Sequence, residues 1–225
     1  MSLFLAQMVE IARKDLLLEL RSRERVTGML ILAILVAVVF SFSMDPTVRL
    51  GGLVGAMLWV TLLFAGMLGL GRSFTLEREQ DAFTGVLLAP VARGALYLGK
   101  YLANLVLLVL TAVVAVPVYA LFFRVDVGGS PGGLLLLVVL ASIGFMALGT
   151  LFSAMAMHTR LGDTLLPILL LPLLLPIVIF AASATQRLLV GRPLAEVMGS
   201  VRMLVAFDLV FLIVCTLVFN SVVEE

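Results

Sequence analysis

Charged residues, cysteine and histidine are scarce in this chain of 225 residues. Lysine, arginine, aspartate and glutamate make up 13% of it, against about a quarter in ordinary soluble domains. The single cysteine, Cys215, cannot form a disulfide within the chain or a cysteine-based metal site, and the single histidine, His158, excludes a centre with several histidines. The net charge of +1 gives no sign of the clustered basic excess that nucleic-acid binding requires. We therefore expect no metal centre, no nucleic-acid partner and no catalytic residues.

Long apolar runs are what the chain has instead. Hydrophobic residues make up 63% of it, and six nearly charge-free runs are each long enough to cross about 30 Å of hydrocarbon as a helix of about 20 residues. Continuous runs lack the alternation of a membrane-barrel strand, so helices are the expected spanning elements. The sequence predicts an all-α polytopic membrane protein with six transmembrane helices in a single domain over residues 1–225. The runs cover residues 26–44, 50–71, 101–123, 127–157, 164–186 and 203–223.

Basic residues are unevenly divided between the two sides of this topology. With the N-terminus inside, the cytoplasmic segments hold about twice as many lysines and arginines as the outer loops. Both termini are therefore expected in the cytoplasm. The outer loop 185–202 is mixed in character and is expected to lie along the membrane interface.

Residues 1–25 precede the first run and are predicted to form an amphipathic helix in the plane of the membrane. Three charged residues spaced by four, Asp15, Glu19 and Arg23, interrupt its apolar side. These residues either form a stripe that faces water or form an ionic seam that docks against the transmembrane bundle. In the second case, Glu19 and Arg23 can pair within one turn of the helix. The apolar arc comprises Phe4, Leu5, Met8, Val9, Ile11, Ala12, Leu16 and Leu20.

The cytoplasmic loop 72–100 joins a charged turn to an apolar helix face. Pro90 ends this pattern because proline cannot continue a helix. Acids on one side and apolar side chains on another suit docking on a protein partner, although a further interfacial helix has the same pattern. The candidate docking residues are Glu77, Asp81, Phe83, Gly85, Val86, Leu87 and Pro90.

Gly94, Gly99 and Lys100 nearly satisfy the phosphate-binding pattern G-x-x-x-x-G-K-[ST]. The last position is Tyr101, which cannot replace a small hydroxyl on magnesium, and no strand precedes the glycines. We expect Lys100 instead to snorkel to the lipid headgroups at the start of the third span. Any ATP that such a protein uses must then be hydrolysed by another subunit.

Asp208 is the only acid well inside a predicted span. A carboxylate there costs a few kcal/mol unless it is paired, protonated or exposed. Its nearness to Arg202 suggests partial exposure at the outer surface. It serves either as a structural polar contact or as part of a substrate path or partner contact.

Prolines and glycines mark two further spans. Three prolines predict a kink in the fifth span, which is either a static bend or part of a conformational change. Small residues in the second and fourth spans allow close approach of helices, within the bundle or between two copies. The prolines are Pro167, Pro172 and Pro176, and the small residues are Gly66, Gly69, Gly71, Gly144, Ala147 and Gly149.

Two stretches resemble a known family. Residues 13–24 read Arg-Lys-Asp-Leu-Leu-Leu-Glu-Leu-Arg-Ser-Arg-Glu and resemble the N-terminal signature of the heme exporter B subunit of bacterial cytochrome c maturation, the CcmB family. The stretch from Glu77 through Gly85 and Pro90 to Lys100 is similar to that family's second cytoplasmic loop, and more widely to permeases of the type-2 ABC exporter class. The number of spans also matches, so the resemblance covers nearly the whole chain.

This resemblance implies an amphipathic N-terminal helix, a coupling helix within loop 72–100 and permease dimerisation in the bacterial inner membrane. It also implies a separate ABC ATPase that binds the coupling helix, further heme-handling membrane subunits and a periplasmic heme chaperone. ATP would be bound by the ATPase and heme by the complex, with no cofactor assigned to this chain. The permease would couple ATP hydrolysis to heme export or to release of the heme-loaded chaperone.

Two other functions fit the residues, and a third fits them poorly. The chain could be a type-2 ABC permease for another substrate, or a non-transporting scaffold, which also needs only docking surfaces. An ion-coupled secondary transporter usually has several buried ionisable sites near the midplane, whereas this chain has one acid. Co-purification of an ATPase separates the ABC functions from the secondary transporter, and a conformational response to ATP turnover separates a permease from a scaffold.

Overall fold

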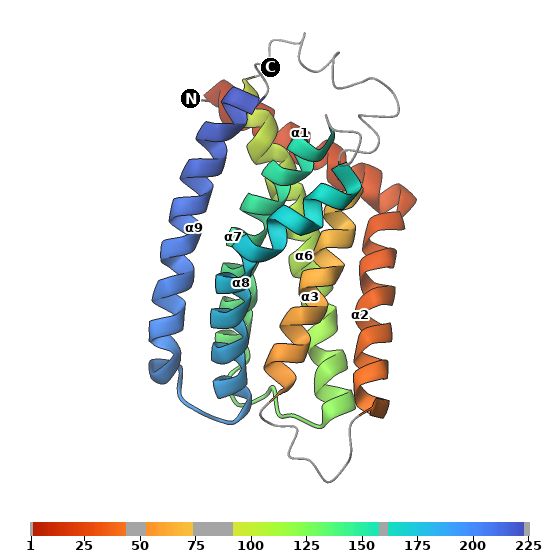
Figure 1. Ribbon diagram of the computed structural model, residues 1–225, viewed down its shortest axis with the longest axis vertical. Helices are drawn as coiled ribbons and strands as arrows, with labels where there is room; N and C mark the ends of the chain where they lie inside the picture. The colour runs from red at the N-terminus through yellow and green to blue at the C-terminus, as the bar shows by residue number, and fades with distance from the viewer. Residues whose placement is uncertain (1, 44–52, 74–91, 158–161, 223–225) are drawn as a thin grey trace.

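The computed structural model describes residues 2–43, 53–73, 92–157 and 162–222. Within these residues the regular structure is helical throughout (Figure 1). Six helices are long and apolar enough to cross a membrane, and they stand side by side while α1 lies across one end of the bundle (Figure 1). This confirms the predicted fold class. The helices are α1 (Ser2–Ser22), α2 (Glu24–Ser43), α3 (Val54–Gly71), α6 (Arg93–Phe123), α7 (Pro131–Met157), α8 (Gly162–Leu189) and α9 (Leu194–Val222).

The most buried spans are α3 and α7, and the least buried are α2 and α9. Helix α3 packs on α2, α6 and α8, while α7 packs on α6, α8 and α9. Helices α2 and α9 occupy opposite flanks of the bundle (Figure 1). The first and last spans therefore face lipid over most of their surface, and the core lies between α3, α6, α7 and α8.

Glycines set the closest contacts within this core. Gly66 of α3 faces the ring of Phe145, and Gly149 of α7 faces the side chain of Leu70. A Cβ at Gly69 would lie 2.6 Å from the sulfur of Met29 in α2. The expected close helix packing is confirmed at these positions, whereas nothing lies within 4 Å of such an atom at Gly71.

The prediction of a long interfacial loop over residues 185–202 is wrong. Helix α8 continues to Leu189 and α9 begins at Leu194, so a short link joins them. The end of α8 is fixed to α3 by two hydrogen bonds: Trp59 Nε1 donates to Thr185 Oγ1, and the Gly55 amide donates to Gln186 Oε1, both at 2.9 Å. These bonds satisfy polar groups that apolar surroundings would otherwise leave unpaired.

Three prolines lie inside α8, namely Pro167, Pro172 and Pro176. Each removes one backbone hydrogen bond and crowds the preceding turn, so the helix axis bends. Figure 1 shows α8 crossing the bundle obliquely in its first part and then running beside the other spans. The predicted kink is confirmed.

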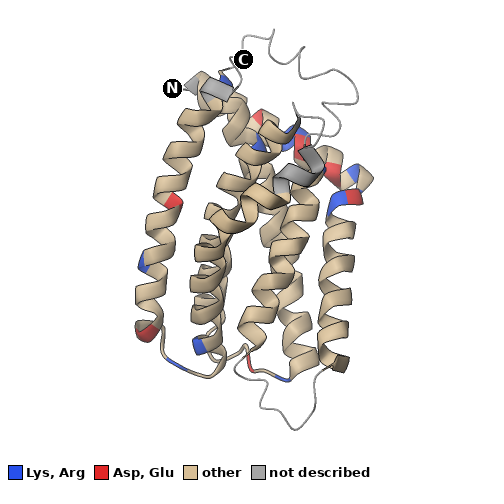
Figure 2. Cartoon of the chain, viewed as in Figure 1, with Lys and Arg blue, Asp and Glu red and all other residues tan. Residues whose placement is uncertain are grey.

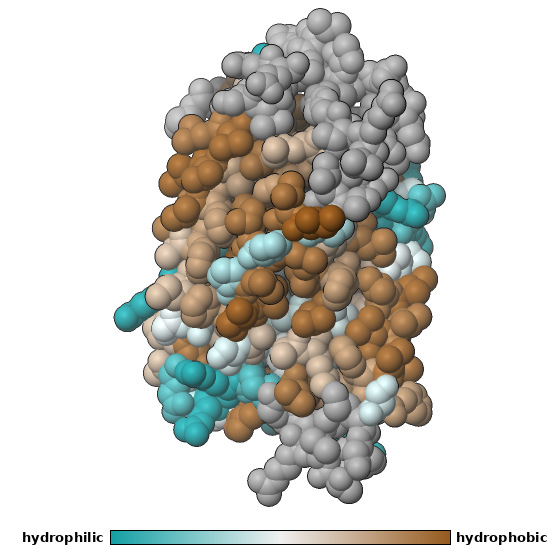
Figure 3. All heavy atoms as spheres, in the orientation of Figure 1, coloured by the Kyte–Doolittle hydropathy of each residue, from teal (hydrophilic) through white to brown (hydrophobic). Residues whose placement is uncertain are grey.

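Charge and hydropathy follow the requirements of a bilayer. Acidic and basic residues gather toward the two ends of the bundle, and α9 also carries charge along its length (Figure 2). Much of the lateral surface seen in Figure 3 is apolar. Exposed side chains such as Ile31, Val113 and Ile213 belong to this lipid-facing surface.

Helix α1 presents two contrasting sides. Asp15, Glu19 and Ala12 are buried against the bundle. Leu5, Val9 and Leu20 are exposed on an adjacent side and form an apolar stripe suited to the membrane interface. The amphipathic helix that the sequence predicts is present, and its interrupted apolar arc is divided between the protein and the lipid.

Candidate functional site

Helix α1 crosses the first turns of α6 at very short range, and Gly99 makes the crossing possible. A Cβ at Gly99 would lie 2.7 Å from the Cβ of Ile11 and 2.9 Å from the carbonyl oxygen of Met8. One turn earlier in α6, Gly94 faces the ring of Phe4 at an ordinary distance of 3.6 Å. A larger side chain at position 99 would push the two helices apart.

A buried ion pair lies beside this crossing. Lys100 Nζ donates to Asp15 Oδ2 at 3.1 Å, and their side chains are only 2% and 8% exposed. Lys14, half-exposed, adds its ammonium 3.3 Å from the other carboxylate oxygen. Removing one partner from a buried pair typically costs about 3–5 kcal/mol, because the remaining charge is left uncompensated. The expectation that Lys100 snorkels to the headgroups is therefore wrong.

The same ammonium group connects α1 to the end of α3. Lys100 Nζ also donates to the carbonyl oxygen of Ser73 at 3.3 Å. Ser73 is the last described residue before the segment 74–91. The start of that segment is thereby held to Asp15 through one lysine.

Asn104, one turn beyond Lys100, also bonds to Ser73 and extends the contacts to two further helices, α2 and α7. Its Oδ1 accepts from Ser73 Oγ at 3.1 Å and from Arg25 Nη2 of α2 at 2.5 Å. Its Nδ2 donates to Thr150 Oγ1 of α7 at 3.0 Å. Because this amide is buried and uses both its donor and its acceptor, it fixes α2, α3, α6 and α7 in one arrangement.

The other end of segment 74–91 also contacts α1. The backbone amide of Ala92, the first described residue after the segment, donates to Gln7 Oε1 at 3.3 Å. Gln7 and Asp15 lie about two turns apart on α1. Helix α1 therefore braces both ends of segment 74–91, directly at Ala92 and through Lys100 at Ser73. We call Gln7, Asp15, Ser73, Ala92 and Lys100 the brace.

The candidate seam of Asp15, Glu19 and Arg23 is divided by the structure. Asp15 pairs with Lys100, and Glu19 is buried and accepts a hydrogen bond from the Val26 amide at 2.9 Å, which satisfies a free N–H at the start of α2. Arg23 is exposed and has a left-handed backbone with φ of 57°, which makes the corner between α1 and α2. The structure thus brings Asp15 and Glu19 to the bundle and leaves Arg23 at its surface.

The candidate docking residues of the cytoplasmic loop lie outside the described residues. These are Glu77, Asp81, Phe83, Gly85, Val86, Leu87 and Pro90. His158 lies outside them as well. Within the described residues, no three histidine, cysteine, aspartate or glutamate side chains come together as a metal site.

The phosphate-loop pattern around Lys100 has a packing role here. Gly94 and Gly99 face α1, and the lysine ammonium is paired with Asp15. All three residues that suggested a nucleotide site are used in the contact between α1 and α6.

Asp208 is buried, and the expectation of partial exposure at the outer surface is wrong. It is 5% exposed and lies at the middle of α9, with Oδ1 2.6 Å from the position of a Cβ at Gly144 in α7. Within the described residues neither of its oxygens has a hydrogen-bond partner. Such a group costs about 2.5–3.5 kcal/mol at a span centre when it is charged.

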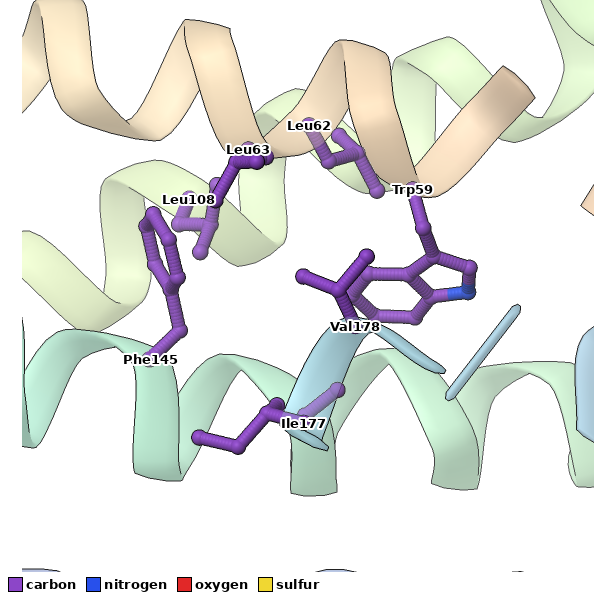
Figure 4. Close-up of a pocket in the computed structure, with 8 residues that line it drawn as sticks. Trp59, Leu62, Leu63, Leu108, Phe145, Ile177 and Val178 are labelled. Carbon is purple, nitrogen blue, oxygen red and sulfur yellow. The ribbon is translucent and has the colours of Figure 1, made fainter. Parts of the chain in front are cut away.

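A small apolar cavity lies in the core between α3, α6, α7 and α8 (Figure 4). Trp59 and Phe145 border it from opposite ends, with Ile177 and Val178 between them (Figure 4). Its volume of about 10 Å³ is close to the minimum that holds one water molecule. A large substrate cannot occupy this cavity without rearrangement of the helices.

Comparison of the sequence with known proteins identifies its family. The family model described as "CcmB protein" matches residues 6–225. The chain is 30% identical over 184 residues to heme exporter protein B of Pseudomonas aeruginosa, covering 81% of this chain and 82% of the relative. It is 30% identical over 173 residues to the protein of that name from Rhodobacter capsulatus, covering 74% of this chain and 78% of the relative. With that from Bradyrhizobium diazoefficiens, the identity is 28% over 178 residues, covering 77% and 80%.

Proposed function

The chain belongs to the CcmB protein family, and on that premise we propose that it is the membrane permease subunit of a heme exporter used in cytochrome c maturation. Relatives named heme exporter protein B match along most of its length. Its six spans supply a transmembrane bundle of the kind a permease needs. ATP would be hydrolysed by a separate ABC ATPase, which this chain would couple to heme export or to release of a heme-loaded chaperone.

The observation that carries the coupling proposal is the brace. An ATPase that docks on the loop at Glu77–Pro90 would displace both ends of segment 74–91. Ser73 and Ala92 would pass that displacement to α1 through Lys100 and Gln7. Asn104 would pass it on to α2, α3 and α7, because it bonds to each of them.

The apolar pocket between α3, α6, α7 and α8 has a volume of only about 10 Å³, so passage of a large substrate through it would need these helices to rearrange. Helices α3 and α7 are the most buried spans, so a change in their packing would open the bundle. The kinked α8 packs on both of them and offers a place for that change.

Orientation and assembly form part of the same proposal. The start of α1 and the end of α9 lie at one end of the bundle (Figure 1), as an even number of spans requires. The excess of basic residues on that side supports cytoplasmic termini. In the bacterial inner membrane, two copies would assemble with the ATPase, other heme-handling membrane subunits and a periplasmic heme chaperone.

The deciding experiment uses cells that lack this chain. We expect them to lose c-type cytochromes and to keep b-type cytochromes, and we expect the wild-type chain to restore the loss. Purification of the tagged chain should recover an ABC ATPase. Normal c-type cytochromes in the deletion strain would contradict the maturation function, and a preparation without any ATPase would contradict coupling.

A scaffold would also restore cytochromes and bind an ATPase, so a second measurement separates it from a permease. Spin labels on α3 and α7 should report a change in distance between ATP-bound and nucleotide-free complexes. Identical distances in both states would indicate a static scaffold.

A further inference from the structure

Asp208 has no role in the coupling route described above, and its surroundings are unusual. The carboxyl group lies against Gly144, whose missing side chain leaves the space that Oδ1 occupies. A Cβ at Gly144 would also lie 2.9 Å from Cδ1 of Ile177 in α8. An acidic group thus occupies the notch at Gly144, where α7, α8 and α9 meet, beside the apolar side chain of Ile177.

The helices packed against α9 bring no cation to this notch. Helix α7 has no ionisable side chain along its length. Helix α8 carries ionisable residues only near its ends, Asp163 and Arg187. On α6, Tyr101 is within electrostatic range of the carboxyl group, and Lys100 is committed to Asp15 and Ser73.

The charges of α9 itself lie elsewhere. Glu196 is near the helix start and pairs with Arg192 at 3.6 Å, and Arg202 is exposed. Cys215 is buried about two turns from Asp208. Asp15 differs from Asp208, because it is similarly buried but pairs with two lysines, Lys14 and Lys100.

A buried acid without a counter-ion favours its uncharged form, because a charged carboxylate at the centre of a span costs about 2.5–3.5 kcal/mol. We propose that Asp208 is a proton-binding site: its carboxyl group carries a proton while α9 is packed on α7 at Gly144, and gives that proton to water when the two helices separate. The O–H bond of the acid breaks, the carboxylate keeps the electron pair, and water accepts the proton. Protonation of Asp208 in the packed state does not depend on which substrate is transported. Release of the proton rests on the proposed transport cycle, which would open a path for water to the carboxyl group.

The first arm of the test measures the proton itself. The full-length chain is prepared with isotope-labelled aspartate in lipid nanodiscs, and infrared spectra are recorded at pH 7. We expect the carbonyl band of a protonated aspartic acid, its loss in Asp208→Asn and its retention in Asp126→Asn, which removes an exposed acid of the outer loop. A missing band in the wild type, or an unchanged band in Asp208→Asn, would overturn the proposal.

The second arm measures release and does not depend on cytochrome maturation. Spin labels replace the exposed residues Leu136 of α7 and Ile213 of α9 in a Cys215→Ala background. Raising the pH should lengthen the distance between the labels in the otherwise wild-type chain and leave it unchanged with Asp208→Asn. The same pH response in both chains would exclude proton release at Asp208, while the proposed permease function would stand.

Discussion

Lys100 lies with its ammonium nitrogen 3.1 Å from the carboxylate of Asp15, although 85 positions of sequence separate the two residues. Both side chains are almost fully buried, so the pair is protected from the screening that weakens surface ion pairs. This contact joins the N-terminal helix to the first turns of α6.

Replacing Lys100 by methionine should destabilise the protein by about 3–5 kcal/mol, because Asp15 would remain buried without its main counter-ion. The double variant Asp15→Leu/Lys100→Met should recover most of this loss, since apolar side chains can fill the same space. Thermal unfolding in detergent measures both effects. Lys14→Ala is the control and should cost less than about 1 kcal/mol, because Lys14 is half-exposed. Equal stability of Lys100→Met and the wild type would show that the pair contributes nothing.

Two alanine substitutions test the crossing of α1 and α6. Gly99→Ala should destabilise the protein by about 1–3 kcal/mol, because the new methyl group would lie 2.7 Å from Ile11. Gly94→Ala should be neutral or stabilising, since its neighbour Phe4 is 3.6 Å away and alanine favours helix. The same unfolding assay and protease sensitivity of α1 compare the pair. If the two variants behaved alike, the close approach at Gly99 would have no energetic consequence.

The loop that precedes Pro90 should bind an ATPase through an aromatic anchor. Phe83→Ala should weaken ATPase association by about 2 kcal/mol or more, whereas Glu79→Ala should have little effect, because truncating a buried anchor costs far more than truncating an exposed charge. The protein should still insert, since the loop carries too much charge to lie within the bilayer. Bound ATPase and its hydrolysis rate are the measurements. Unimpaired association in both variants would leave the loop an ordinary interfacial helix.

Topology can be tested with single cysteines in a Cys215→Ala background. Ser22→Cys, at the exposed end of α1, should react with an impermeant maleimide only from the cytoplasm. Gly129→Cys, in the link between α6 and α7, should react only from outside, and nothing lies within 4 Å of its new side chain to hinder labelling. The reverse pattern would invert the orientation derived from the loop charges.

The spans were predictable because hydrocarbon selects for uninterrupted apolar length. The helix ends are harder to predict, because charged residues bound the apolar runs but do not end the helices. Helix α9 begins at Leu194 and carries Glu196 and Arg202 on its first turns, which is why Asp208 is central rather than near an end. Helix α6 likewise begins at Arg93 and includes Lys100, whose charge is neutralised by a residue that sequence spacing alone could not identify.

The positions of Asp15, Glu19 and Arg23 were also only partly predictable from their spacing in the sequence. Spacing by four places Asp15, Glu19 and Arg23 on one arc of a continuous helix. The left-handed backbone at Arg23 ends that helix, so Arg23 leaves the arc and Glu19 bonds to Val26 instead. Glycines were easier to interpret, because small residues within apolar spans predict close packing wherever they occur.

The long sequence separation between Asp15 and Lys100 also affects when α1 can pack against α6 during synthesis. Chain synthesis proceeds from the N-terminus, so α1 leaves the ribosome well before Gly99 and Lys100 exist. Until α6 has been inserted, α1 lacks its main docking surface, and the apolar stripe of Leu5, Val9 and Leu20 can hold it at the membrane surface meanwhile. Helix α1 therefore completes its docking only after the third span, α6, is in place.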